Sequence, residues 1–174
     1  MRVKNRSAHR VGYTIPNGAR RVFNSGETLD IPIEEIGQLM YQPGGKVLVE
    51  RYLLIPAEGR KALGWDWEVQ PEYDYTEEQI KNILIKGSLD EFLDMLDFAP
   101  EGVITLVREY SITLPLTDMN KMEAFKEKFG YDVATAIKHK KAVEKELSGD
   151  TAATAPEAPK RRVPAATSQY KIVE

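Results

Sequence analysis

Side chains that could do chemistry are most concentrated on one predicted helix, which carries the carboxylates Asp90, Glu91, Asp94 and Asp97. Asp90, Asp94 and Asp97 recur at spacings of four and three, so a helix places them on one face. A hard cation needs carboxylates that converge from several segments, and one helical stripe does not enclose an ion. We therefore expect a solvated face without a metal site. Contact with a basic partner is the alternative.

Other residues suited to catalysis occur in weak contexts. The sequence has no cysteine and only two histidines, His9 and His139, which excludes disulfides, thiolate zinc sites and a cysteine nucleophile. The run 44–46 (GGK) lacks the first glycine and the Ser or Thr of a phosphate-binding loop. The GxSxG motif of a serine nucleophile is also missing. We expect a protein that is not an enzyme and holds no cofactor.

Basic residues near the N-terminus form a first candidate binding surface. The set comprises Arg2, Lys4, Arg6, His9 and Arg10, with Arg20 and Arg21 as neighbours across a predicted hairpin. Arg2, Lys4 and Arg6 alternate, so a strand would place them on one face. A solvated sheet face is the simplest interpretation. Contact with nucleic acid or with an acidic partner is the alternative.

The amino-acid composition of the sequence changes near Ser148. Residues 149–168 are rich in Ala, Pro and Thr and carry too little apolar surface to offset the entropy of ordering, so we expect a disordered tail from 148 to 174. Residues 169–173 (QYKIV) are β-prone again and are predicted to dock by adding a strand to a sheet edge. A frayed terminus is the alternative. The predicted contact residues are Lys160, Arg161, Arg162, Tyr170, Lys171, Ile172 and Val173.

The first part of the chain, residues 1–71, is predicted to be a β-rich subdomain with one or two helices. Strands are expected at 11–15, 20–23 and 28–31, a helix over 33–41, and a short helix from 46 that runs into a strand at 53–55. Turn signals such as Pro16-Asn17-Gly18 separate the strands. Trp65 and Trp67 lie on the connector over 56–71, and we expect them to pack the seam between two subdomains.

Apolar residues recur at helical period from Thr76 onward, which predicts a compact bundle of about five short helices over residues 72–147. The expected helix starts are the capping boxes Thr76–Gln79 and Ser88–Glu91, Pro100, and the N-caps Asp118 and Asp132. The fold class is therefore α+β.

Net charge and hydropathy restrict the partners and the cellular compartment that we expect for the protein. The chain has 174 residues and a net charge of −3, which argues against a surface that grips nucleic acid everywhere. The basic start, residues 1–10, is followed by no apolar segment of a signal peptide, and no run approaches the roughly 18 apolar residues of a membrane span. We expect a soluble protein in a reducing compartment, without a membrane partner.

Short motifs are spread along residues 1–141. They are Gly12-Tyr13-Thr14-Ile15-Pro16, Ser25-Gly26-Glu27 leading to Ile31 and Glu34-Glu35, Tyr41-Gln42-Pro43-Gly44-Gly45, Leu89-Asp90-Glu91-Phe92-Leu93, Asp97-Phe98-Ala99-Pro100-Glu101-Gly102, Leu114-Pro115-Leu116 and Phe129-Gly130-Tyr131-Asp132-Val133. With these motifs the chain resembles a family of small uncharacterised proteins of tailed bacteriophages of Gram-positive hosts. The resemblance contains no known catalytic motif. It implies a phage origin and, from what phage proteins of this size do, a role in the virion or its assembly.

The predicted function is a non-enzymatic structural or accessory component of a phage particle. We expect it to associate with the capsid, the head–tail connector or the tail, and to bind other virion proteins partly through its own C-terminal tail. An oligomeric assembly and a virion location, after synthesis in the cytoplasm of the bacterial host, follow from that role. The alternative is an early phage regulator that binds nucleic acid or a host protein through the basic N-terminal face.

Overall fold

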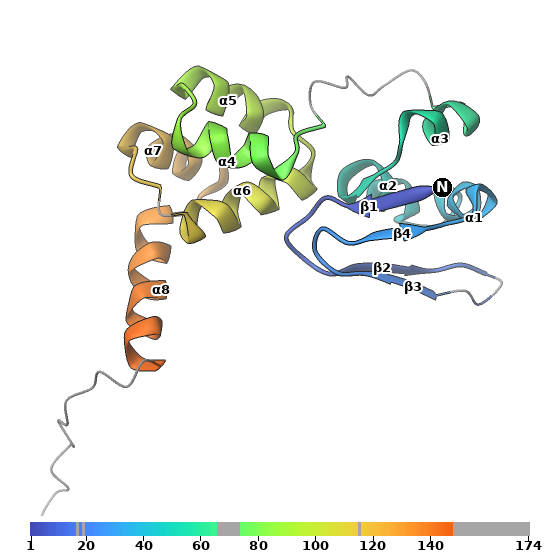
Figure 1. Cartoon of the computed structure of the whole chain (residues 1–174), viewed down its shortest axis with the longest axis horizontal. Helices are drawn as coiled ribbons and strands as arrows, with labels where there is room; N and C mark the ends of the chain where they lie inside the picture. The colour runs from blue at the N-terminus through green and yellow to red at the C-terminus, as the bar shows by residue number, and fades with distance from the viewer. Residues whose placement is uncertain (17, 19, 66–73, 115, 148–174) are drawn as a thin grey trace, which may run out of the picture.

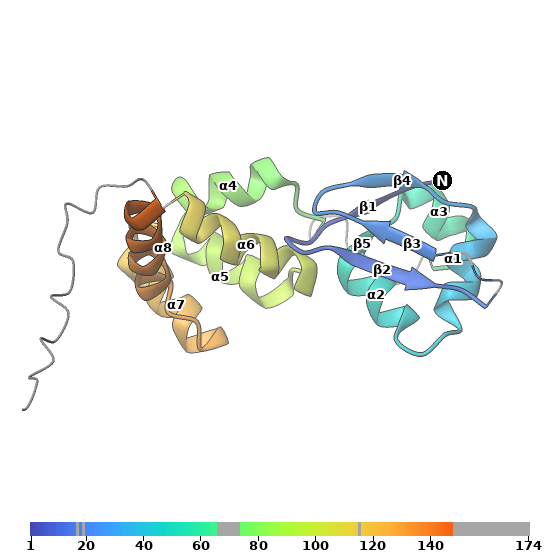
Figure 2. The same ribbon diagram turned by 90° about the horizontal axis from the view of Figure 1, so that it is seen from below.

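The chain forms two halves that lie side by side, a β-rich N-terminal half and an all-helical C-terminal half (Figures 1 and 2). The structure is a computed structural model, and it describes residues 1–16, 18, 20–65, 74–114 and 116–147. This arrangement confirms the predicted α+β class. Over the described residues, no helix is both long and apolar enough to cross a bilayer.

The strands of the N-terminal half form two separate sheets. In the first, β1 (Arg2–Asn5) lies between β4 (Thr28–Asp30) and β5 (Leu53–Leu54), and both pairings are antiparallel. The second is the hairpin of β2 (Val11–Thr14) and β3 (Arg20–Phe23). Apolar side chains alternate along these strands, which buries one face of each sheet.

Three short helices complete this half: α1 (Ile33–Met40), α2 (Gly45–Tyr52) and α3 (Ala57–Ala62). The tight turn between α1 and α2 needs its glycines, because Gly44 has a φ of 77° and a Cβ on Gly45 would lie 1.8 Å from the Leu39 carbonyl oxygen. The expected helix-to-strand change at residue 53 is present. Helix α3 was not expected within the connector.

The N-terminal half has a hydrophobic core of its own. The N-terminal core consists of Val3, Tyr13, Ile15, Phe23, Ile31, Ile36, Leu39, Val49, Leu53 and Ile55. Trp65 packs against this core, so the expectation that it lies in the seam between the halves is wrong. Trp67 lies outside the described residues.

Over its described residues, the C-terminal half contains five helices: α4 (Glu77–Ile85), α5 (Leu89–Phe98), α6 (Glu101–Thr113), α7 (Met119–Phe129) and α8 (Val133–Leu147). Their apolar faces form a second cluster, the C-terminal core. It consists of Ile80, Leu84, Phe92, Met95, Leu96, Val103, Ile104, Leu106, Val107, Leu116, Phe125 and Val133.

The helix ends follow the signals in the sequence. Both capping boxes are formed; in the first, Thr76 Oγ1 accepts from the Gln79 amide and the Gln79 side chain accepts from the Thr76 amide. Asp118 accepts from two amides of the first turn of α7. Gly130 ends that helix with a φ of 65°. Local chemistry therefore fixes most boundaries in this half.

A buried lysine joins three helices of the C-terminal half. The side chain of Lys121 is almost fully enclosed, with 2% of the residue exposed. Its Nζ donates to the carbonyl oxygens of Ile83 (2.8 Å), Leu84 (3.3 Å) and Gly87 (2.6 Å), and it lies 5.9 Å from the centre of the Phe92 ring. One ammonium thus satisfies the carbonyl end of α4 and complements its dipole.

Replacing Lys121 by Met should lower the free energy of unfolding by about 2–4 kcal/mol, because the buried carbonyl oxygens lose their donor. Urea denaturation of the full chain measures this loss. The control is Lys61→Met, which removes an exposed ammonium from α3. Equal stability of the two variants would show that Lys121 does not hold the end of α4.

Candidate binding surfaces

The predicted basic face of Arg2, Lys4 and Arg6 does not form one surface. Strand β1 ends at Asn5, so Arg6 does not continue the strand alternation, and it is buried with 9% of the residue exposed. Lys4 is half-buried and Arg2 is exposed. The expected alternation was wrong for Arg6 because the strand stops one residue too early.

Arg6 instead connects the two halves through an ion pair. Its Nη1 donates to Asp74 Oδ1 at 2.9 Å, and its Nη2 donates to the Glu50 carbonyl oxygen. Asp74 Oδ2 also accepts from Arg60 Nη1 at 3.0 Å. Burial lowers the pKa of the Arg6 guanidinium, and the charge of Asp74 opposes that effect. Asp74, just before α4, is thus held between two arginines of the N-terminal half.

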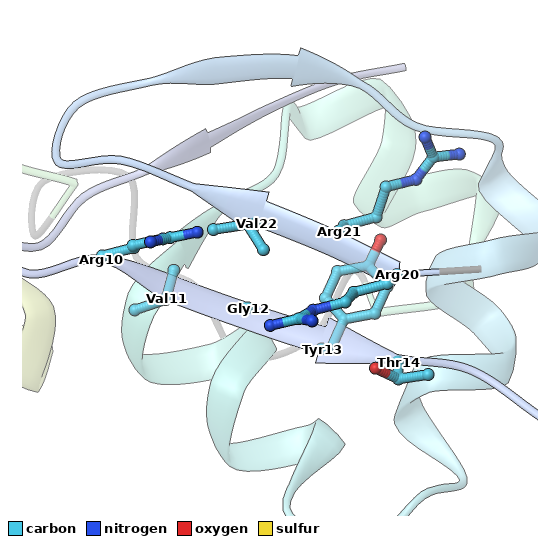
Figure 3. Close-up of a pocket in the computed structure, with 8 residues that line it drawn as sticks. All are labelled: Arg10, Val11, Gly12, Tyr13, Thr14, Arg20, Arg21 and Val22. Atoms are coloured by element: carbon cyan, nitrogen blue, oxygen red, sulfur yellow. The ribbon is translucent and has the colours of Figure 1, made fainter. Parts of the chain in front are cut away.

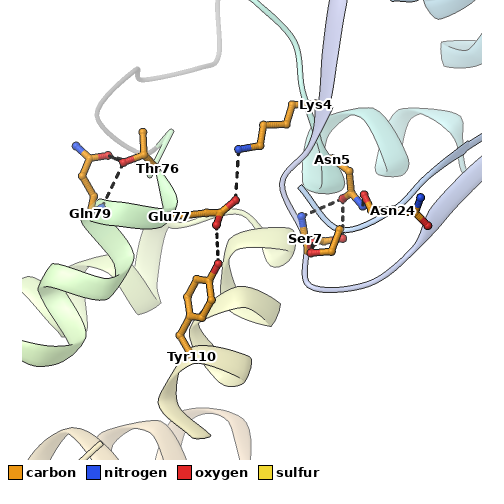
Figure 4. A network of polar contacts seen from close by, with 9 residues as sticks. Lys4, Asn5, Ser7, Asn24, Thr76, Glu77, Gln79 and Tyr110 are labelled. Carbon is orange, nitrogen blue, oxygen red and sulfur yellow. Dashed lines mark hydrogen bonds and ion pairs between the residues drawn. The ribbon is translucent and has the colours of Figure 1, made fainter. Parts of the chain in front are cut away.

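Lys4 makes a second link between the halves (Figure 4). Its Nζ lies 3.4 Å from Glu77 Oε1 at the start of α4, while the Tyr110 hydroxyl of α6 donates to Glu77 Oε2 at 2.8 Å. The bond from Tyr110 lowers the pKa of Glu77, and Lys4 adds to this effect. The pKa of the Tyr110 hydroxyl is raised by burial and by the neighbouring carboxylate.

The loop after β1 is held rigidly where it meets the helical half. Asn5 Oδ1 accepts from the Ser7 amide (2.9 Å) and from the Ser7 hydroxyl (2.7 Å), and Asn5 Nδ2 donates to the Asn24 carbonyl oxygen (Figure 4). The next residue, Ala8, donates its amide to Thr105 Oγ1 in α6 at 3.0 Å. These bonds fix the backbone that carries Arg6.

Helix α6 approaches α2 closely at a glycine. A Cβ on Gly102 would lie 2.7 Å from the Arg51 carbonyl oxygen and 3.2 Å from the Arg6 carbonyl oxygen. Beside it, Arg51 Nη1 pairs with Glu101 Oε2 at 2.9 Å. We call the contact formed by Lys4, Arg6, Ala8, Arg51, Arg60, Asp74, Glu77, Glu101, Gly102, Thr105 and Tyr110 the seam. It is mainly polar, in contrast to the two cores that it joins.

Replacing Asp74 by Asn should lower the free energy of unfolding by about 2–4 kcal/mol, because it leaves the buried Arg6 guanidinium without its counter-charge. Chemical denaturation at neutral pH measures the effect. The matched control is Asp30→Asn, an exposed position at the end of β4, which should change stability by less than about 0.5 kcal/mol. A loss at Asp74 no larger than at Asp30 would contradict the role of the ion pair.

The second polar cluster lies under the β2–β3 hairpin. Glu35 of α1, with 6% of the residue exposed, accepts from Arg21 Nε and Nη2, both at 2.9 Å, and from the Tyr13 hydroxyl at 2.7 Å. The bidentate bond from Arg21 lowers the pKa of Glu35 despite its burial. The pKa of the Tyr13 hydroxyl is raised, first by burial and then by Glu35. Arg21 is thereby neutralised within the fold.

The outer side of the same hairpin is an open basic hollow. We call it the hairpin trough; its volume is about 470 Å³, and it is lined by Arg10, Val11, Gly12, Tyr13, Thr14, Arg20, Arg21 and Val22 (Figure 3). Arg10 and Arg20 are exposed, and neither forms an ion pair with any described residue. The sequence indicated Arg10 as a member of the basic N-terminal set and Arg20 as a neighbour of that set across the hairpin. The β2–β3 register, which pairs Thr14 with Arg20, brings them together.

The acidic face of α5 is exposed, as expected. Asp90, Asp94 and Asp97 are all solvent-facing, and Asp97 pairs with Lys128 of α7. Glu91 accepts from the Ser88 amide in its capping box. Among the described residues, no group of three or more potential ligands is arranged to hold a metal ion.

The predicted contact residues of the tail lie outside the described residues, so their docking stays a prediction. They are Lys160, Arg161, Arg162, Tyr170, Lys171, Ile172 and Val173. Comparisons of the chain with protein-family models, with curated proteins and with solved structures found no match.

Lowering the pH should weaken the fold through Glu35. Its pKa in the folded protein lies below the ordinary value of 4.5, so the stability that it contributes is present above pH 4.5 and is lost as the pH falls through the lowered folded value. The difference in the free energy of unfolding between the wild type and Glu35→Gln should therefore become smaller from pH 7 to pH 3. Urea denaturation at a series of pH values measures that difference. The control is Glu34→Gln, its exposed neighbour, whose difference from the wild type should stay near zero throughout.

Proposed function

We propose that this protein is a non-enzymatic structural or accessory component of a phage particle, and that it binds a second particle protein through α8 and the residues that follow. The observation that carries the proposal is the course of α8. The helix extends away from the rest of the helical half (Figure 1). It packs against α6 and α7 near its start, where Val133 is buried, whereas residues 141–147 are all exposed.

The exposed part of α8 carries a stripe suited to a partner. Val133, Ala136, Lys140, Val143 and Leu147 follow one another at spacings of three, four, three and four, the spacing of a helix–helix contact. The first member of the stripe is 1% exposed, whereas Val143 and Leu147 are 39% and 83% exposed. The stripe thus begins in the C-terminal core and continues where nothing described covers it. An amphipathic helix laid against a partner buries such a surface.

The phage assignment rests on the resemblance described above, from the motifs over residues 12–16 to those over 129–133. Under this proposal the protein works within an assembly of several virion proteins, associated with the capsid, the connector or the tail. A regulator that acts through the N-terminal basic face is less well supported, because Lys4 and Arg6 are engaged in the seam. The segment 169–173 would supply a further contact with the partner.

Placing charge on the α8 stripe should release the protein from particles without unfolding it. In Val143→Asp/Leu147→Asp both side chains are exposed, so the thermal midpoint should stay near that of the wild type. Gradient-purified particles should contain the wild type at fixed stoichiometry and lose at least about nine-tenths of the variant, because a charge at the centre of a helix–helix contact must be desolvated.

The matched control is Lys138→Gln/Lys141→Gln, which makes the same net change in charge on the opposite side of α8 and should stay bound. Deletion of residues 168–174 tests the tail separately and should also weaken binding. If the aspartate variant were found in particles at the same stoichiometry as the wild type, the role of α8 would be contradicted. Complete absence of the wild type from particles would contradict the virion role.

A further inference from the structure

Two arginines reach over the same point of the hairpin from opposite ends. In the register of β2 and β3, Gly12 faces Val22 and Thr14 faces Arg20, and Arg10 lies just before β2. Figure 3 shows the guanidinium of Arg10 directed toward Val22 and that of Arg20 directed back toward Gly12. Two cations that form no ion pair with any described residue thus lie on one small surface, and a bound anion would relieve their mutual repulsion.

Between the two arginines, strand β2 lies close against β3. A Cβ on Gly12 would lie 2.8 Å from the Arg21 carbonyl oxygen and 3.4 Å from Val22 Cγ2, so this position has no room for a larger side chain. The exposed Thr14 hydroxyl, on the same strand, is a further donor. The neighbouring carboxylate, Glu35, is on the inner side and is occupied by Arg21 and Tyr13. None of the described residues that line the trough carries a carboxylate.

We propose that the hairpin trough binds the phosphate groups of a nucleic-acid backbone. Guanidinium forks match phosphate oxygens in a bidentate manner. An acidic protein segment offers similar charge, but stable protein contacts need a desolvated apolar anchor. The apolar side chains that line the trough are Val11 and Val22, both half-buried, and the ring of Tyr13 is buried on the inner side. A charged surface without such an anchor suits a polyanion, whose binding is driven by counterion release.

The same features predict how the nucleic acid is bound. Among the described residues that line the trough, none offers an exposed aromatic ring on which an unpaired base could stack. Contacts with phosphates alone carry no sequence information. We therefore infer weak, sequence-independent binding to duplex, with a dissociation constant of about 10⁻⁴–10⁻⁶ M per copy at physiological salt. Several copies in one assembly would bind the same duplex more tightly.

This inference goes beyond the proposed function and does not depend on it. The trough lies in the N-terminal half and α8 extends from the C-terminal half (Figure 1). A substitution in one of these surfaces can therefore be tested for binding at the other surface, which it leaves unchanged.

The test is the salt dependence of binding between the full chain and a 20-base-pair DNA duplex, followed by fluorescence anisotropy. Two phosphate contacts predict that log K falls with log salt at a slope of about −1.8. Arg10→Gln/Arg20→Gln should lower the affinity at least tenfold and abolish most of this slope. The control is Lys61→Gln/Lys86→Gln, which removes two exposed charges outside the trough and should keep the wild-type slope.

Four further measurements decide the outcome. Duplexes of unrelated sequence should bind equally well, which supports contacts with the backbone. Binding of poly-glutamate as tightly as DNA at equal charge would overturn the inference in favour of an acidic protein partner, and an unchanged slope in the arginine variant would overturn it altogether. Thermal denaturation of the arginine variant must match the wild type, and its occupancy of particles should be retained, because α8 is intact.

Discussion

The ion pair between Arg6 and Asp74 is the contact on which the arrangement of the two halves depends. Each half has its own hydrophobic core, and each core is small. A small core contributes little free energy of unfolding, so the contacts between the two cores make up a large share of the stability of the whole chain. Burying Arg6 is costly unless its charge is matched, and Asp74, which lies next to the first helix of the other half, supplies the match. Because the buried Arg6 guanidinium needs a counter-charge, Asp74 and the start of α4 beside it are held next to Arg6.

The rest of the seam reinforces this geometry with directional bonds. Glu77 binds Lys4 of β1 and Tyr110 of α6, and Thr105 receives the amide of Ala8. Gly102 lets the backbone of α6 approach α2. Hydrogen bonds and close backbone packing specify an orientation more narrowly than an apolar contact of the same size. In our account, the seam holds the hairpin trough and α8 at a fixed separation, so that a particle protein bound at one end and a duplex bound at the other would be held in a defined relation.

The helical half could be predicted from sequence because its signals are local. The capping boxes at Thr76 and Ser88, the N-cap at Asp118 and the stop at Gly130 each act within one turn of helix. The seam could not be predicted, because Arg6 and Asp74 are 68 residues apart and nothing near either residue indicates the other. The same limit applies to Lys121, whose carbonyl partners lie 34 to 38 residues earlier. Trp65 was misplaced because its aromatic character indicates burial but not the core in which it is buried. Arg10 and Arg20 could be listed from sequence, but only the hairpin register places them over Gly12.

Coupling of the two separate cores by the polar seam can be measured by following equilibrium unfolding with two probes. With Trp67 replaced by Phe in every protein tested, tryptophan fluorescence reports on the N-terminal core, against which Trp65 packs, and far-ultraviolet circular dichroism is dominated by the helical half. The two transitions should coincide in the protein with an intact seam and should separate in the Asp74→Asn/Glu77→Gln variant, in which each half unfolds on its own. Separate transitions with the seam intact, or coincident ones in the variant, would show that the seam does not couple the two cores.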